Sequence, residues 1–274
     1  LSLGYSRIVS RAGARLSLAL SGSESETLGV FPVIGSRRDA SVGLTFPMII
    51  EDNRRINLTV SAAGFRESSD FFGIRILDQT GREVSAALGT FHRGAQWTLS
   101  ASLGLTTGQF DNAVTGVSGN GYSFASASVS FAHNITPDIF GSVQIGMQQT
   151  LSGPMPSARQ FTSTAASAVR GYPASLSTGD EGYYARFQIE KSTPFAISGP
   201  DYGLRPFAFF DVGEVKDSTG ASLGQARSAG RAALHCFRQP GGAVEVLIEH
   251  LRPARRWVIF GGGHDAQPLV RMAK

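Results

Sequence analysis

Residue types that commonly carry out chemistry are sparse in this sequence. The single cysteine, Cys236, has only His235 beside it and cannot form a disulfide within the chain. Neither a CxxC nor an HExxH spacing occurs that would hold a metal, and no GxSxG motif or pair of carboxylates stands out for catalysis. We therefore expect a protein that is not an enzyme and that uses no metal and no cofactor.

A glycine-rich turn near the C-terminus has the form of a nucleotide-binding motif. Residues 257–260 (Trp-Val-Ile-Phe) have the composition of a buried strand, and Gly261-Gly262-Gly263-His264 and a helical stretch follow. Strand, glycine turn and helix in this order are typical of the opening of a nucleotide-binding βαβ unit. Gly261, Gly263 and His264 are therefore candidates for the remnant of such a turn; an ordinary tight loop is the alternative. We expect no complete dinucleotide site.

Three short motifs combine glycine with charged residues in the middle of the chain. They are Val169-Arg170-Gly171-Tyr172, Gly179-Asp180-Glu181-Gly182 and Phe209-Phe210-Asp211-Val212-Gly213. The first two occupy a long segment between expected strands, and the third lies within a strand. Asp211 falls on the strand face opposite Ala208, Phe210 and Val212. A solvated loop arginine and an unrelated strand aspartate are one alternative interpretation of these charges.

The elements that would position these motifs are strands, because apolar and polar residues alternate with a period of two. The clearest apolar series are Trp97, Leu99, Ala101, Leu103 and Leu105; Ile56, Leu58, Val60 and Ala62; Ala125, Ala127, Val129 and Phe131; and Ile139, Gly141, Val143, Ile145 and Met147. No comparable helical stripe occurs before about residue 225, so we expect an all-β fold with about ten strands in this region.

The polar face of these strands distinguishes a membrane barrel from a soluble sandwich. It consists mainly of Ser, Thr, Gln, Asn and Gly, and charged residues are only 17% of the chain. Such a face suits the wet lumen of a barrel whose other face meets lipid. Short connections (51–54, 92–96 and 134–138) also take turns with long ones (21–40, 65–82, 106–121 and 150–181), as in outer-membrane barrels.

The three motifs, in this order and within this pattern, resemble the two-partner secretion transporters of the haemolysin secretion and activation family. The resemblance spans residues 1–225. It implies that Val169, Arg170, Gly171, Tyr172, Gly179, Asp180 and Gly182 belong to a loop that folds back into the barrel. It further implies that Arg170 pairs with Asp211 on the lumen wall, beside Phe209 and Gly213. A guanidinium suits this role, because it binds a carboxylate through two hydrogen bonds.

The family resemblance also implies a function. The chain would lie in the bacterial outer membrane, contact lipid and passively export a secreted exoprotein, without nucleotide hydrolysis. A net charge of +4 without a Lys/Arg run gives no indication of nucleic-acid binding. Family barrels have roughly sixteen strands, in keeping with even-numbered barrels, so we expect a fragment. A non-secreting barrel remnant or an assembly factor is the alternative.

The C-terminal part predicts a second domain. Residues 240–274, from Glu249-His250-Leu251-Arg252-Pro253 to Phe260-Gly261-Gly262-Gly263-His264, resemble the start of the Rossmann domain of the xanthine dehydrogenase accessory factor family (XdhC/CoxI). We accordingly divide the chain into a barrel segment, 1–225, and a truncated XdhC-like opening, 226–274. This tail alone would favour a cytoplasmic molybdenum-cofactor accessory factor. Joining a membrane barrel to a cytoplasmic fold is best explained by a gene rearrangement, frameshift or assembly error.

Overall fold

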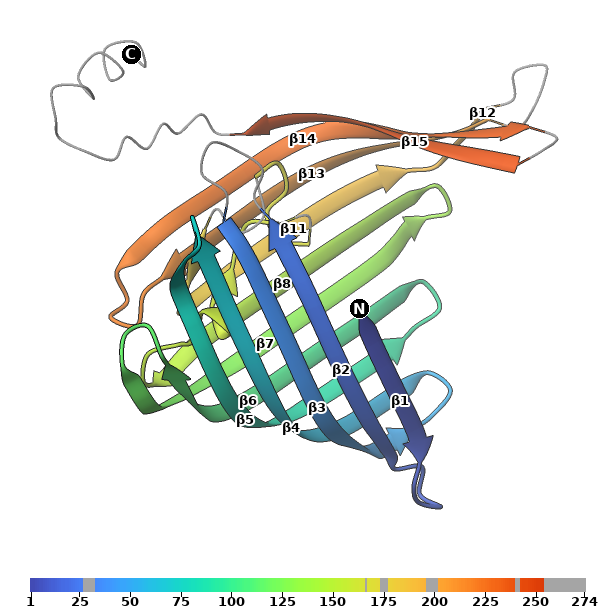
Figure 1. Ribbon diagram of the computed structural model, residues 1–274. Coiled ribbons are helices and arrows are strands. Elements are labelled where there is room, and N and C mark those ends of the chain that lie inside the picture. The colour runs from blue at the N-terminus through green and yellow to red at the C-terminus, as the bar shows by residue number, and fades with distance from the viewer. Residues whose placement is uncertain (27–32, 166, 173–176, 196–201, 240–241, 254–274) are drawn as a thin grey trace, which may run out of the picture.

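The computed structural model describes residues 1–26, 33–165, 167–172, 177–195, 202–239 and 242–253 (Figure 1). Most of them form one antiparallel sheet. Its strands are β1 (Ser2–Ile8), β2 (Arg15–Glu26), β3 (Val33–Ile50), β4 (Arg54–Phe71), β5 (Ile74–Arg93), β6 (Trp97–Asn112), β7 (Val117–Thr136), β8 (Ile139–Ser152), β11 (Glu181–Lys191), β12 (Thr193–Phe195), β13 (Tyr202–Lys216), β14 (Ser222–Gln239) and β15 (Gly242–Pro253). The strand order in the sheet is β1-β2-β3-β4-β5-β6-β7-β8-β11-β13-β14-β15, and the short β12 pairs with β13.

The sheet curves into an open trough (Figure 1). Among the described strands, β1 and β15 each pair on one side only, so they form the two edges of a partial barrel. The strands β1–β8, β11 and β13 confirm the expectation of about ten strands before residue 225. No helix in the described part of the chain is long and apolar enough to cross a membrane.

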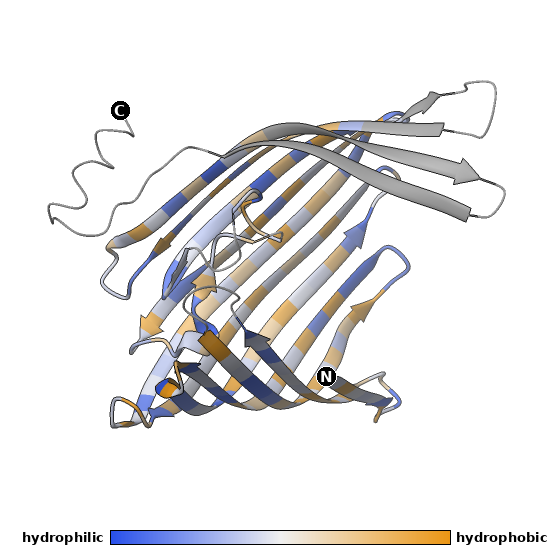
Figure 2. Ribbon diagram, turned by 45° about the horizontal axis from the view of Figure 1, so that its top comes forward, coloured by the Kyte–Doolittle hydropathy of each residue, from blue (hydrophilic) through white to orange (hydrophobic). Residues whose placement is uncertain are grey.

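The two faces of the sheet differ in polarity, and Figure 2 shows the alternation along the coloured strands. On the outer face, Leu103, Val129 and Ile145 leave 59%, 37% and 37% of their surface exposed. On the concave face, serine hydroxyls bond across neighbouring strands, with 2.7 Å between the Oγ atoms of Ser61 and Ser85. Large apolar side chains that stay exposed on one side of a sheet fit a wall in contact with lipid.

The hairpins at one end of the sheet are short, as the sequence predicts. Their turns occupy residues 51–53, 94–96 and 137–138. At the opposite end, three of the predicted long loops (21–40, 65–82 and 106–121) are largely strand among their described residues. β4 and β5 continue to a two-residue turn at Phe72 and Gly73, where φ is 50° and 75°. Positive φ at both central residues is the geometry that matches the twist of paired strands.

These two strands have 18 and 20 residues, whereas about 9–11 residues cross a membrane. The hairpins therefore extend beyond the apolar band, and there polar residues occupy both faces. Arg66 and Asp78 are an example, with 3.6 Å between Nε and Oδ1. Alternation disappears in such a stretch, and this explains why the sequence pattern predicts a loop between Phe65 and Arg82.

The connection between β8 and β11 is different, because it leaves the sheet. We call residues 153–180 the inner loop; it lies on the concave side of the sheet (Figures 1 and 2). It contains a 3₁₀ turn, η1 (Ser157–Arg159), and a small antiparallel pair, β9 (Phe161–Thr162) with β10 (Thr178–Gly179). The inner loop carries two of the three sequence motifs.

The region after residue 225 continues the sheet. β14 begins at Ser222 and pairs with β13, and β15 pairs with β14 up to Pro253. The predicted domain boundary at 225/226 therefore falls inside β14. Residues 254–274, including Gly261, Gly263 and His264, lie outside the described residues, so the Rossmann-like opening stays a prediction.

Candidate functional site

The centre of the candidate site is an ion pair between the inner loop and the wall. The Nε of Arg170 donates to Oδ2 of Asp211 at 2.7 Å, and Nη2 donates to Oδ1 at 2.9 Å. The backbone N–H of Arg170 also donates to Oδ2, at 3.2 Å. The Asp211 side chain is fully buried and that of Arg170 is 12% exposed. Such a bidentate ion pair fixes both the position and the orientation of the arginine side chain.

Two further groups on the wall hold the guanidinium. Gln188 on β11 accepts a hydrogen bond from Nη1 at 2.7 Å. The ring of Phe209 lies under the guanidinium carbon, 3.9 Å from ring centroid to Cζ. Since Phe209 and Asp211 are two residues apart on β13, the strand pleat places both on the concave face. Removing either charge would leave its partner buried and unpaired, at a cost of about 3–5 kcal/mol.

The other residues of the loop motif shape the tip around Arg170. Val169 is fully buried, and its N–H donates to the carbonyl of Ser163 at 3.0 Å. Gly171 has φ of 84°, a conformation that residues with a Cβ rarely adopt. The hydroxyl of Tyr172 donates to the carbonyl of Arg227 on β14 at 2.8 Å. The tip is therefore held by β13 and by the strand after it.

The motif glycines mark places where two backbones come close together. A Cβ on Gly179 would lie 2.5 Å from the carbonyl oxygen of Lys216, and one on Gly182 would lie 2.6 Å from that of Glu214. On β13, a Cβ at Gly213 would approach Cγ2 of Val169 to 3.0 Å. A larger residue at Gly179 or Gly213 would thus push the inner loop away from β13, and one at Gly182 would push β11 and β13 apart.

Asp180 closes the inner loop at its exit, away from Arg170. Its carbonyl accepts hydrogen bonds from Nε2 of Gln148 at 3.1 Å and from Oγ1 of Thr150 at 3.2 Å. Its Oδ1 accepts one from Nε2 of Gln160 at 3.2 Å. The structure therefore brings Arg170, Phe209, Asp211 and Gly213 together with the loop tip, while Asp180 joins the loop to β8.

A second charged contact was missed in the sequence analysis. Arg159 of η1 donates from Nε to Oε2 of Glu83 on β5 at 2.7 Å, and its Nη2 lies 3.7 Å from Oδ1 of Asp39 on β3. Burial lowers the pKa of Arg159. The hydrogen bond to Glu83 and the nearby acidic groups together raise it by more than burial lowers it, so the pKa of Arg159 stands above its ordinary value. The only signal in the sequence is a carboxylate on an otherwise Ser-rich face.

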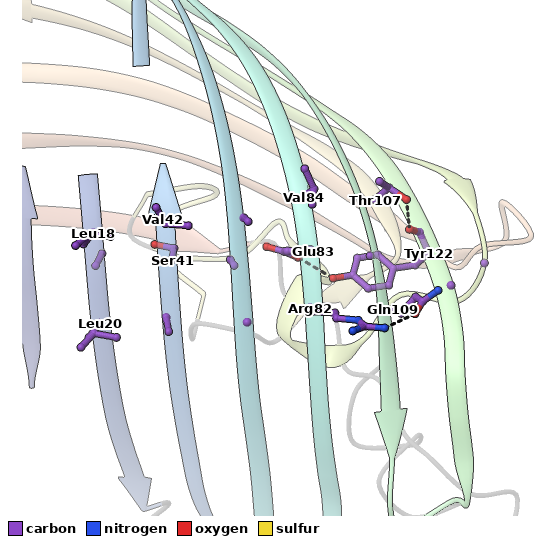
Figure 3. Close-up of a pocket in the computed structure, with 18 of the residues that line it drawn as sticks. Leu18, Leu20, Ser41, Val42, Arg82, Glu83, Val84, Thr107, Gln109 and Tyr122 are labelled. Carbon is purple, nitrogen blue, oxygen red and sulfur yellow. Dashed lines mark hydrogen bonds between the residues drawn. The ribbon is translucent and has the colours of Figure 1, made fainter. Parts of the chain in front are cut away.

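A groove of about 1160 Å³ crosses strands β2 to β7 beside this contact (Figure 3). Its lining is largely apolar or small, with Leu18, Val42 and Val84 among the labelled residues. Tyr122 and Glu83 also line it, and the Tyr122 hydroxyl donates to Oε2 of Glu83 at 2.7 Å. In the described part of the chain, no group of three or more His, Cys, Asp or Glu residues could hold a metal ion.

Comparison with known proteins identifies the family. The model of the haemolysin secretion/activation protein ShlB/FhaC/HecB matches residues 51–233, a span that contains all three motifs. The chain belongs to this family. It is therefore an outer-membrane β-barrel protein of the two-partner secretion type, and the family resemblance read from the motifs is confirmed. No curated protein matches the chain.

Two solved structures show the same fold. CdiB from Escherichia coli is 15% identical, with a TM-score of 0.63, and the match covers 88% of this chain and 48% of that one. CdiB from Acinetobacter baumannii is 14% identical, with a TM-score of 0.68, and the match covers 88% and 44%. The chain thus spans less than half the length of either. The resemblance of residues 240–274 to the XdhC family stays a prediction.

Proposed function

We propose that the chain forms the pore wall and inner loop of a transporter that exports a partner exoprotein across the outer membrane. In this proposal the inner loop occupies the lumen at rest and moves when the exoprotein passes. The observation that carries the proposal is the fully buried Asp211, which holds Arg170 of the loop tip through two hydrogen bonds. The proposed resting role of the loop in the lumen accounts for a buried ion pair that holds it on the concave face.

The concave face suits an unfolded chain in transit. Its serine and threonine hydroxyls, such as the pair Ser102 and Ser128 at 2.8 Å, both donate and accept hydrogen bonds. They could therefore bond transiently to the backbone of an extended polypeptide without selecting particular side chains. Passage of this kind requires no catalysis, metal or nucleotide. The partners in this proposal are the exoprotein and membrane lipid, and no nucleic acid.

The proposal is tested by deleting the gene in its native host and comparing the proteins in the medium. A secreted protein should disappear on deletion and return when the wild-type gene is supplied. The variant Arg170→Ala should not restore it, although heat-modifiable migration should show that its barrel is folded. If the set of secreted proteins is unchanged by the deletion, the export function is wrong.

A further inference from the structure

The inner loop has two arginines with wall contacts, and they bind different parts of the wall. Arg170 pairs with Asp211 on β13, which we call the first anchor. Arg159 pairs with Glu83 on β5 and approaches Asp39 on β3, which we call the second anchor. In the sheet, β6, β7, β8 and β11 lie between β5 and β13. Five steps between adjacent strands separate the anchors by roughly 24 Å along the sheet.

The second anchor is a network and not an isolated surface pair. Oε2 of Glu83 accepts hydrogen bonds from both Arg159 and the Tyr122 hydroxyl, each at 2.7 Å. The side chains of Arg159 and Glu83 are only 16% and 12% exposed. The guanidinium of Arg159 also lies over the ring of Phe65, 4.8 Å from its centroid. Low exposure and a shared acceptor make the contact much stronger than a solvated ion pair.

Ser157, two residues earlier, binds the same part of the wall. Its hydroxyl lies 2.8 Å from Oε2 of Glu67 and 2.8 Å from Oε1 of Gln79, and its N–H donates to Gln79 at 3.1 Å. Nη1 of Arg37 donates to the carbonyl of Ala158 at 3.3 Å. All three residues of η1 are thus held by side chains of β3, β4 or β5.

Apolar packing completes the attachment. Met155 of the inner loop is 6% exposed and packs into a buried apolar cluster with Phe65, Phe110, Tyr122 and Phe124. Ala158 packs against the same cluster. Four wall aromatics thus enclose one loop methionine, and this packing adds to the polar contacts that η1 makes with the wall.

We infer that Glu83 and Arg159 are positioning residues that hold the first half of the inner loop independently of Arg170 and Asp211. The inference rests on the proposed function and deepens it: the loop must leave both anchors before the lumen opens. Breaking the first anchor alone frees the tip but leaves η1 on β3–β5. Loss of the second anchor alone loosens η1, which keeps the hydrogen bonds of Ser157 and the packing of Met155, and leaves the tip on β13.

The test follows release of the loop directly. A single cysteine is placed at position 158 (Ala158→Cys) in a Cys236→Ser background, and its reaction with a membrane-impermeant maleimide is timed in native outer membranes. Glu83→Gln should speed the labelling about tenfold, which corresponds to about 1.4 kcal/mol of lost protection. Glu51→Gln, a matched change in an exposed turn, should leave the rate unchanged. Heat-modifiable migration reports whether each variant is folded.

Two further variants separate an ion pair from general packing damage. Arg159→Glu combined with Glu83→Arg should return the labelling rate toward that of the parent. Glu83→Gln combined with Arg170→Ala should increase conductance in planar bilayers by more than the sum of the single changes. Labelling at the parent rate in Glu83→Gln overturns the inference, as does faster labelling that the charge exchange does not reverse. Labelling does not depend on secretion, so a failed export assay leaves this result interpretable.

Discussion

The guanidinium of Arg170 binds both carboxylate oxygens of Asp211, a residue 41 positions later in the chain, at 2.7 and 2.9 Å. The first residue belongs to a loop and the second to a strand of the wall. Since the Asp211 side chain has no exposed surface, its charge has no access to bulk water and depends on this partner. The pair therefore ties the position of the inner loop to one buried side chain of the wall.

Asp211→Asn should weaken this attachment, because the neutral amide leaves the Arg170 charge buried without a counter-ion. We expect export of the partner to fall at least about tenfold, which corresponds to about 1.4 kcal/mol of the 3–5 kcal/mol typical of a broken buried pair. Immunoblotting of the medium measures it. Asp138→Asn, in an exposed turn, is the matched control and should export normally.

The charge exchange Arg170→Asp with Asp211→Arg extends this test. If the two residues act as a pair, the double variant should export more than either single variant. If export stays as low as in the single variants, export does not depend on an ion pair between these two positions.

Gly179→Ala should displace the exit of the inner loop. The added Cβ would lie 2.5 Å from the Lys216 carbonyl oxygen, which is backbone and cannot rotate away. Overpacking of this kind costs about 1–3 kcal/mol. We expect faster protease cleavage of the loop in intact outer membranes. Gly89→Ala, where no atom lies within 4 Å of the new Cβ, is the control, and equal cleavage of the two variants would contradict the prediction.

The orientation of the wall is tested by placing arginine on each face of β6. Leu103 is 59% exposed on the outer face, whereas Ser102 bonds to Ser128 on the concave face. Leu103→Arg should lower the free energy of unfolding in lipid vesicles by about 2–4 kcal/mol, the cost of arginine at the membrane midplane. Ser102→Arg should cost much less, because its charge meets water. If urea titrations show a larger loss of unfolding free energy for Ser102→Arg than for Leu103→Arg, the assignment of the lipid-facing and lumen-facing sides is wrong.

The sequence predicted the strands where one face meets lipid, because there the two environments impose strict alternation. It failed at Arg66 and Asp78, where the hairpin lies beyond the apolar band and both faces are polar. The predicted boundary at 225/226 falls within β14, where the run Ser228-Ala229-Gly230-Arg231-Ala232-Ala233 does not alternate, and the division into two domains stays a prediction.

The sequence predicted those site residues that belong to contiguous motifs. Arg170 and Asp211 each stand in such a motif, so the resemblance points to both. Arg159 and Glu83 do not; each is a common residue in an undistinguished stretch. They meet only because the inner loop, which leaves β8, folds back past β7 and β6 to β5. Contacts of that kind depend on the path of the loop, which local patterns do not encode.

Tyr172→Phe should have a smaller effect than the loss of the ion pair. The hydroxyl of Tyr172 donates to the Arg227 carbonyl at 2.8 Å, and a neutral hydrogen bond contributes about 1 kcal/mol. Phenylalanine keeps the aromatic ring, and Arg170 keeps both of its bonds to Asp211. We therefore expect export within about fivefold of the wild type, against at least about tenfold loss for Asp211→Asn. If Tyr172→Phe abolished export as completely as Asp211→Asn does, the hydroxyl would have to act during passage of the exoprotein, and the ion pair would not be the main attachment of the loop tip.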